Sequence, residues 1–178
     1  MSATRYPPYN LLSTPFSHHL SSNGDGTGTR HATGNHSVTP LTLKLVPGEG
    51  VIYNVASLTI IIEDGGGFDA GMYGNGITLT NGISIRVRDN DGNVLVDLTN
   101  GEPIKTNGLL MHFFSTVTYL NFGSGNDVLQ GHINFQESMG DFLQLRDNES
   151  LEVVFNDNFT GLVHHDLVAQ GHVVRGRA

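Results

Sequence analysis

Alternation of apolar and polar residues is clearest in the middle of the chain. The apolar residues of one segment all fall on one parity: Ile77, Leu79, Ile83, Ile85 and Val87. Threonine, serine and arginine fall on the other parity, and a period of two places one face of a strand on a core and the other in water. Asp89–Asn93 is typical of a hairpin turn, and apolar residues alternate again from Val94 to Leu98. The pattern predicts a β-hairpin.

Further apolar, β-branched stretches follow the same rule. They predict strands over residues 41–46, 51–63, 109–122, 128–136, 142–146, 151–155 and 162–174. Clusters of Gly, Asn, Asp and Pro separate most of them, and no window shows a sustained helical repeat. Many short strands with such turns favour an antiparallel sandwich or barrel. We predict an all-β fold, a jelly roll of about eight strands.

Residues 1–39 differ in composition from the rest of the chain. They hold three of the six prolines (Pro7, Pro8 and Pro15) and a long run of Ser, Gly, Thr and Asn. Such a segment buries too little surface to offset an ordering cost of roughly 1–2 kcal/mol per residue. We therefore predict an extended N-terminal arm over residues 1–39 and a β-sandwich domain over residues 40–178.

Charge and composition exclude several classes of protein. The 17 acidic and nine basic residues give a formal net charge of −8, whereas nucleic-acid binding needs a basic surface. The chain has no cysteine, which excludes disulfides, thiolate metal sites and a cysteine nucleophile. No window approaches the roughly 18–20 apolar residues of a membrane span. We expect neither nucleic acid nor membrane as a partner.

Histidine is the residue whose number suggests chemistry, with nine in the chain. His112, His132 and either His164 or His165 could converge on neighbouring strands, about 4.8 Å apart, and hold the metal of a jelly-roll enzyme. However, the sequence has no His-x-His motif, and adjacent histidines point to opposite faces of a strand. We favour surface or interface histidines and assign no metal, cofactor or catalytic residue.

Three glycine-containing motifs resemble parts of known sites but lack their context. Gly65–Ala70 fits G-x-G-x-x-A, yet the residues after it disfavour the helix that a dinucleotide site needs. Asp89–Asn93 resembles a calcium loop with its glycine misplaced, and Gly123-Ser-Gly125 lacks the spacing around a serine nucleophile. We interpret all three as loops or turns and predict that the protein is not an enzyme.

The arm, the glycine-rich and cysteine-free sandwich and the lack of a catalytic motif resemble the small jelly-roll cement and decoration proteins of tailed bacteriophage heads. The segments Asn81–Leu95 and Glu149–Phe155 are similar in style to phage structural proteins. The resemblance covers most of the chain without a diagnostic motif. It implies an accessory virion protein on the capsid surface, often a homotrimer, that binds the major capsid protein and stabilises the head.

The resemblance also implies that the arm carries the contacts with the capsid. Its apolar anchors are Tyr6, Tyr9, Leu11, Leu12 and Phe16, which a groove on the partner would bury. Alternatively, these side chains pack on the protein's own sheet. Under the first interpretation, deletion of residues 1–39 abolishes capsid binding and leaves the sandwich folded.

The alternative function is a receptor- or carbohydrate-binding head domain of a phage fibre or spike. In that case the loop Asp64–Gly76, with Phe68 and Tyr73, forms the binding surface. The chain has no tryptophan, which argues against a sugar site, because such sites favour large stacking faces.

Overall fold

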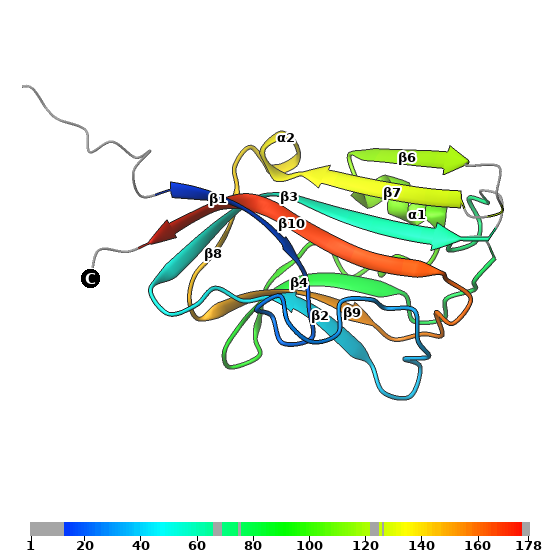
Figure 1. Ribbon diagram of the computed structural model, residues 1–178, viewed down its shortest axis with the longest axis horizontal. Helices are drawn as coiled ribbons and strands as arrows, with labels where there is room; N and C mark the ends of the chain where they lie inside the picture. The colour runs from blue at the N-terminus through cyan, green and yellow to red at the C-terminus, as the bar shows by residue number, and fades with distance from the viewer. Residues whose placement is uncertain (1–12, 66–68, 75, 122–124, 126, 176–178) are drawn as a thin grey trace, which may run out of the picture.

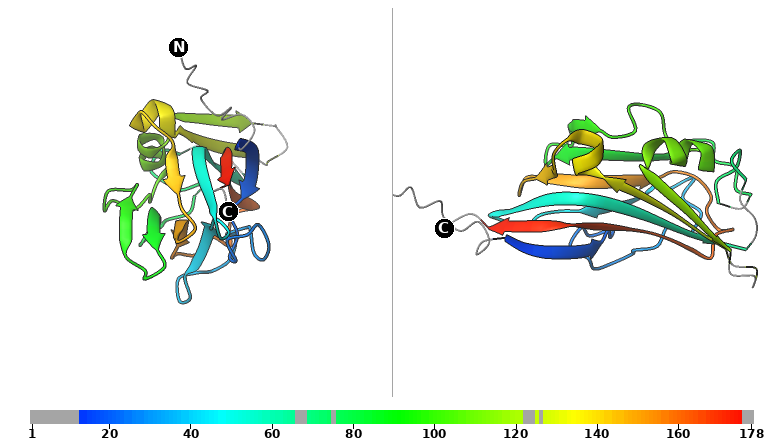
Figure 2. Two further views of the ribbon diagram at one scale, coloured as in Figure 1. Left: turned by 90° about the vertical axis from the view of Figure 1, so that its left-hand side faces the viewer. Right: turned by 90° about the horizontal axis from the view of Figure 1, so that it is seen from above.

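Two antiparallel sheets pack face to face in the computed structural model of the chain, which describes residues 13–65, 69–74, 76–121, 125 and 127–175 (Figure 1 and Figure 2). The first sheet contains, in order, β1 (Ser13–His19), β10 (His164–Arg175), β3 (Val51–Asp64), β7 (Asp127–Asn134) and β6 (Thr116–Asn121), with β8 (Leu143–Leu145) also paired with β3. The second contains β2 (Leu41–Leu45), β9 (Glu149–Phe155), β4 (Ile83–Asp89) and β5 (Val94–Asp97). The helices are α1 (Asn107–Phe113) and α2 (Phe135–Met139). In the described ranges, no helix is long and apolar enough to span a bilayer.

The strand order is that of a jelly roll. Four antiparallel pairs are nested along the chain: β1 with β10, β2 with β9, β3 with β7 and β4 with β5. This is the arrangement of one long hairpin rolled up into two sheets, which the pairs β10–β3 and β9–β4 complete. β6 and β8 are additions to these eight strands. The prediction of an all-β antiparallel sandwich is confirmed, with ten strands in the described residues.

The core lies between the sheets and consists of alternate residues of their strands. Buried side chains of the first sheet include Leu58, Ile60, Ile62, Leu167 and Ala169, and those of the second include Leu43, Ile85, Leu151, Val153 and Phe155. Full burial of one such aliphatic side chain contributes roughly 1.5–3 kcal/mol. Apolar residues with a period of two therefore determine which face of each sheet is inside.

The predicted hairpin is confirmed as β4 and β5. Alternate residues of β4 are buried, and at the predicted turn the Gly92 N–H donates to the Asp89 carbonyl at 3.1 Å. β4 begins at Ile83 rather than at Ile77. The reason is that the backbone amides just before β4 bind the carboxylate of Asp157 instead of a neighbouring strand.

The strand predicted over residues 109–122 is wrong in its first half, which lies in helix α1. Thr106 caps this helix, because its hydroxyl accepts the Leu109 N–H at 3.1 Å. Leu110 and Phe114 are buried four residues apart, which is the spacing of a helix face. The second half of the segment contains β6, as predicted.

Part of the predicted arm lies on the sandwich. Ser13–His19 forms the edge strand β1 against β10 (Figure 1). Phe16, Leu20 and Ala32 contribute buried apolar side chains to the core. Residues 1–12 lie outside the described residues, so for them an extended arm stays a prediction.

Candidate functional site

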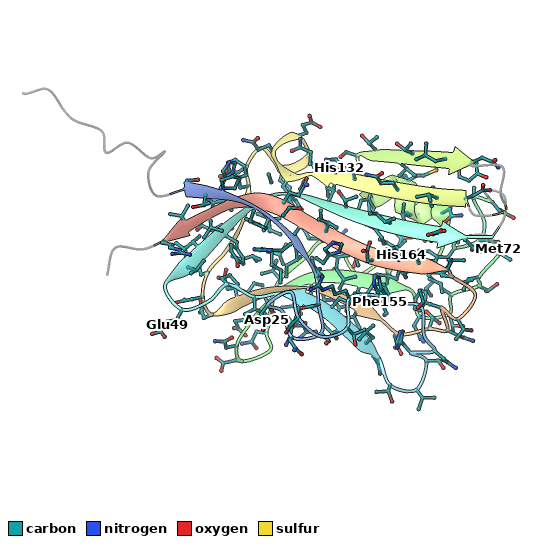
Figure 3. The ribbon with its side chains drawn as sticks, in the orientation of Figure 1. Asp25, Glu49, Met72, His132, Phe155 and His164 are labelled. Atoms are coloured by element: carbon teal, nitrogen blue, oxygen red, sulfur yellow. The ribbon has the colours of Figure 1, made fainter. Side chains whose placement is uncertain are left out.

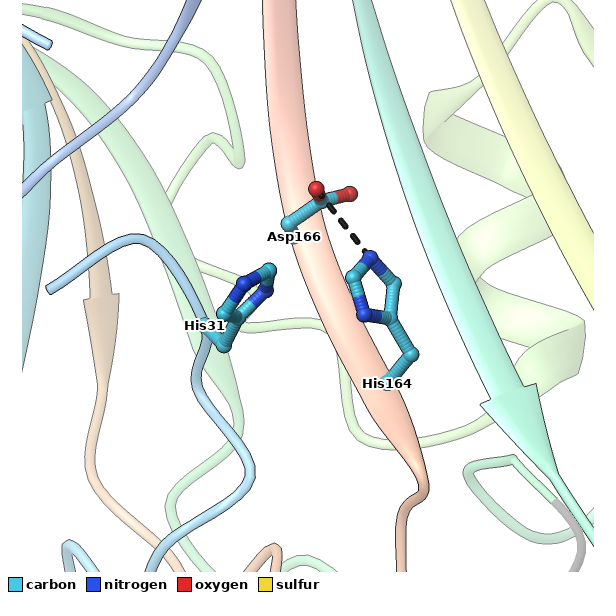
Figure 4. Close-up of side chains that lie close together, drawn as sticks. All are labelled: His31, His164 and Asp166. Carbon is cyan, nitrogen blue, oxygen red and sulfur yellow. Dashed lines mark ion pairs between the residues drawn. The ribbon is translucent and has the colours of Figure 1, made fainter.

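Histidines gather around one buried aspartate near the start of β10 (Figure 4). The side chain of Asp166 is 3% exposed, and its Oδ2 lies 3.1 Å from His19 Nδ1 and 3.2 Å from His164 Nε2. The ring of His31 lies 4.5 Å from that of His164, centroid to centroid. We call these four residues the Asp166 cluster. One carboxylate and three imidazoles thus meet on the outer side of the first sheet.

Two segments far apart in the sequence build the cluster. The alternation of a strand places His164 and Asp166 on the outer face of β10 and His165 on the inner face. β1 ends beside them, and the loop after β1 returns to the same edge of β10. There the Ala32 N–H donates to the His165 carbonyl at 2.9 Å. This hydrogen bond holds the neighbouring His31 over the strand.

The carboxylate of Asp166 is buried, with no lysine or arginine of the described residues in ion-pair contact with it. In the described part of the chain its ion pairs are with His19 and His164. The His19 nitrogen lacks the alignment of a hydrogen bond, and Asp166 Oδ1 has no hydrogen-bond partner. A buried carboxylate is costly unless a cation or several donors compensate it. The cluster is therefore suited to hold a positive charge.

His165 forms a separate buried pair with Tyr73 on the inner face of β10. Its Nε2 lies 2.7 Å from the Tyr73 hydroxyl and its Nδ1 lies 3.4 Å from the Ala32 carbonyl. Because a carbonyl only accepts, Nδ1 carries the proton and the Tyr73 hydroxyl donates to Nε2. Burial lowers the pKa of His165 to about 3 and raises the pKa of Tyr73 well above 10. Both groups are therefore neutral members of the core.

The histidines predicted as possible metal ligands do not converge. His132 lies on β7, where its Nδ1 is 3.0 Å from Thr59 Oγ1, and β3 separates it from His164 on β10 (Figure 3). His112 lies exposed on α1. The set that comes together instead is His31, His164 and Asp166. Only the spacing His164-x-Asp166, which puts both side chains on one face of a strand, was visible in the sequence.

Of the predicted partner-binding residues, four lie outside the described residues: Tyr6, Tyr9, Leu11 and Leu12. Phe16 is 9% exposed, and its ring lies 4.8 Å from that of Tyr53 on β3, centroid to centroid. Phe16 thus packs on the protein's own sheet, which is the alternative considered for it.

Hydrogen bonds to Asn107 hold part of the loop that was predicted as an alternative receptor surface against the sandwich. The side-chain amide of Asn107 donates to the carbonyls of Asp69 and Gly74, at 2.8 and 2.7 Å. Tyr73 is fully buried, so its ring is not available to stack on a ligand. Phe68 lies outside the described residues.

The edge strand β5 exposes a row of apolar side chains. Val94 is 45% exposed, Leu95 49% and Val96 37%, and among the strands that the structure describes β5 pairs only with β4. By contrast, β1, an edge strand of the first sheet, carries Pro15, which has no N–H group to donate to a neighbouring strand. We call residues 94–96 the β5 edge; it carries no proline, although the register of its pairing with β4 shifts at Leu95 and the charged Asp97 ends the strand.

Comparisons of the chain with protein-family models, with curated proteins and with solved structures found no match.

Proposed function

We propose that the chain is a structural virion protein, an accessory capsid protein that self-associates, in our hypothesis as a homotrimer, and binds the major capsid protein on the capsid surface. The jelly-roll order of the strands and the resemblance to phage decoration proteins support this assignment. The observation that carries it is the β5 edge. An assembly protein needs an exposed apolar surface whose burial against a second chain is favourable.

Edge strands of monomeric proteins are normally protected from pairing with other chains. Proline, inward charges, bulges or a covering loop serve this purpose. The β5 edge has three consecutive apolar side chains, all more than a third exposed. The register shift at Leu95 disfavours the addition of a regular strand, but a row of exposed apolar side chains of this kind favours association with another chain through side-chain contacts. We therefore assign the β5 edge to self-association.

Replacing Leu95 with lysine is expected to weaken self-association about tenfold. The substitution places a charge in an interface where burial of a leucine contributes roughly 1.5–3 kcal/mol. Light scattering coupled to size-exclusion chromatography, over a dilution series, measures the mass of the assembly. Val38→Lys is the matched control, because Val38 is 90% exposed and lies outside the β5 edge. A wild-type chain that stays monomeric, or two variants with equal effects, would contradict the assignment.

Binding to the capsid is tested by co-sedimentation with virus heads that lack this chain. The full chain is expected to sediment with the heads to a saturating ratio, and a variant without residues 1–12 to bind at least about tenfold more weakly, because it lacks four apolar anchors. The truncation ends at residue 12 because Phe16, Leu20 and Ala32 belong to the core. Equal binding by both proteins would refute the role of the arm. No binding by the full chain would refute the proposed function.

A further inference from the structure

We propose that the Asp166 cluster is a zinc site, in which His31, His164 and Asp166 bind Zn²⁺ and His19 supplies a fourth ligand. The ion fastens β1 and the loop after it to β10. This site goes beyond the proposed function, since neither self-association nor capsid binding requires it. The inference rests on the distances between the ligand atoms, on the burial of Asp166 and on the types of ligand present.

Two of the distances between candidate ligand atoms are close to those of a tetrahedral zinc site. Zn–N and Zn–O bonds of about 2.0–2.1 Å place the ligand atoms roughly 3.3 Å from one another. Asp166 Oδ2 already lies 3.2 Å from His164 Nε2 and 3.1 Å from His19 Nδ1. One ligand atom each from His31, His164 and Asp166 lie within 4.8 Å of one another. His31 is exposed on a loop, and in the proposed site its ring moves closer to the ion.

The burial of Asp166 independently points to a cation. Its side chain is 3% exposed, and Oδ1 has no hydrogen-bond partner. In the described residues the ion-pair partners of this carboxylate are the imidazoles of His19 and His164, with no lysine or arginine among them. A divalent ion bound by the same imidazoles compensates the buried charge.

The ligand types select the metal. Three imidazoles and one carboxylate suit Zn²⁺, whose protein sites combine histidine with aspartate or glutamate. Ca²⁺ and Mg²⁺ prefer sites made of oxygen ligands, so neither fits this set. The ligands come from β1, from the following loop and from β10, so the ion cross-links three segments. In a chain without cysteine, where no disulfide can form, a bound zinc ion offers a cross-link between them.

The test is calorimetric titration of Zn²⁺ into the full chain, prepared free of metal and without a histidine tag. We expect one ion per chain in the wild-type protein. His31→Gln and His164→Gln are each expected to weaken binding at least about tenfold. His112→Gln is the matched control, because His112 is exposed on α1 and outside the cluster, and its affinity should stay within about twofold of wild type. The absorption spectrum of the Co²⁺-substituted protein reports whether the site is tetrahedral.

Thermal unfolding separates ligand loss from misfolding. His31→Gln changes an exposed loop residue, so without metal its melting temperature should match that of the wild-type chain. Zn²⁺ should raise the melting temperature of the wild-type chain and of His112→Gln but not that of His31→Gln. The proposal is overturned if Zn²⁺ does not bind, or if binding is unchanged in His31→Gln and His164→Gln. Either result leaves the capsid and self-association experiments unaffected, so failure of this site and of the proposed function are distinguishable.

Discussion

Replacing Asp157 with alanine is expected to lower the free energy of unfolding by about 3–4 kcal/mol. Its carboxylate is 5% exposed and accepts hydrogen bonds from three consecutive backbone amides. Oδ1 lies 2.9 Å from the Thr80 nitrogen, and Oδ2 lies 3.0 Å from the Asn81 nitrogen and 2.6 Å from the Gly82 nitrogen. The alanine variant leaves three amides at the entrance to β4 without their acceptor, one of them buried (Gly82) and two partly buried, which costs more than one exposed hydrogen bond. Urea unfolding followed by circular dichroism measures the change.

Two further variants show whether the carboxylate itself is responsible. Asp157→Asn keeps one oxygen as an acceptor, so it should cost about half as much as the alanine variant, roughly 1–2 kcal/mol. Asp147→Ala removes an exposed carboxylate that accepts one amide, from Gly50 at 3.3 Å, and should cost less than about 0.5 kcal/mol. If Asp157→Ala and Asp147→Ala have equal effects, the amide-binding role assigned to Asp157 is wrong.

The buried His165 is expected to make the folded state less stable as the pH falls. Burial, with smaller contributions from His164 and His36, lowers its pKa to about 3 from an ordinary value of 6.5. The unfolded chain therefore binds a proton at this residue below pH 6.5 while the folded chain does not. The free energy of unfolding is therefore not reduced by this group above pH 6.5, and it falls progressively as the pH is lowered from 6.5 toward 3. Between pH 7 and pH 4.5 the loss amounts to about 2–3 kcal/mol.

His165→Gln isolates this contribution, because glutamine does not titrate and can still reach polar partners. The variant should be less stable than wild type at pH 7, by about 1–2 kcal/mol, owing to its weaker bond with Tyr73. The difference between the two proteins should then shrink or reverse as the pH falls to 4.5. His172→Gln, an exposed site on the same strand, should keep the wild-type dependence on pH. Parallel curves for wild type and His165→Gln in urea unfolding at several pH values would exclude the effect.

Alternation of apolar residues was a sufficient guide to much of the sandwich. β4 and β9 are predicted from the sequence because one face of each repeats with a period of two, and β5 because it follows a hairpin turn. β1 was not predicted, since its composition is polar and includes Pro15; it is a strand because β10 offers it an edge. Helix α1 was taken for a strand because its apolar residues are large or aromatic, although the capping threonine and the four-residue spacing were present in the sequence.

The candidate site was less predictable than the fold. His19, His31 and Asp166 come together only because β1 and the loop after it lie along one edge of β10. No local sequence pattern predicts the register of the β1–β10 pairing, because the paired residues lie about 150 positions apart in the sequence. Only the pair on β10 could be identified from spacing. For the predicted partner-binding residues outside the described ranges, the composition of the segment is the only basis of the prediction.

The nesting of the jelly roll also sets the order in which the chain can fold during synthesis. β1 leaves the ribosome long before β10, and His19 pairs opposite Val168. At about 5–20 residues per second, β1 waits roughly 7–30 s for its partner strand. Throughout that interval a polar segment with few apolar side chains exposes little that aggregates. The composition that made residues 13–39 look like an arm thus keeps this segment from adding an aggregation-prone stretch to the nascent chain before the last strand arrives.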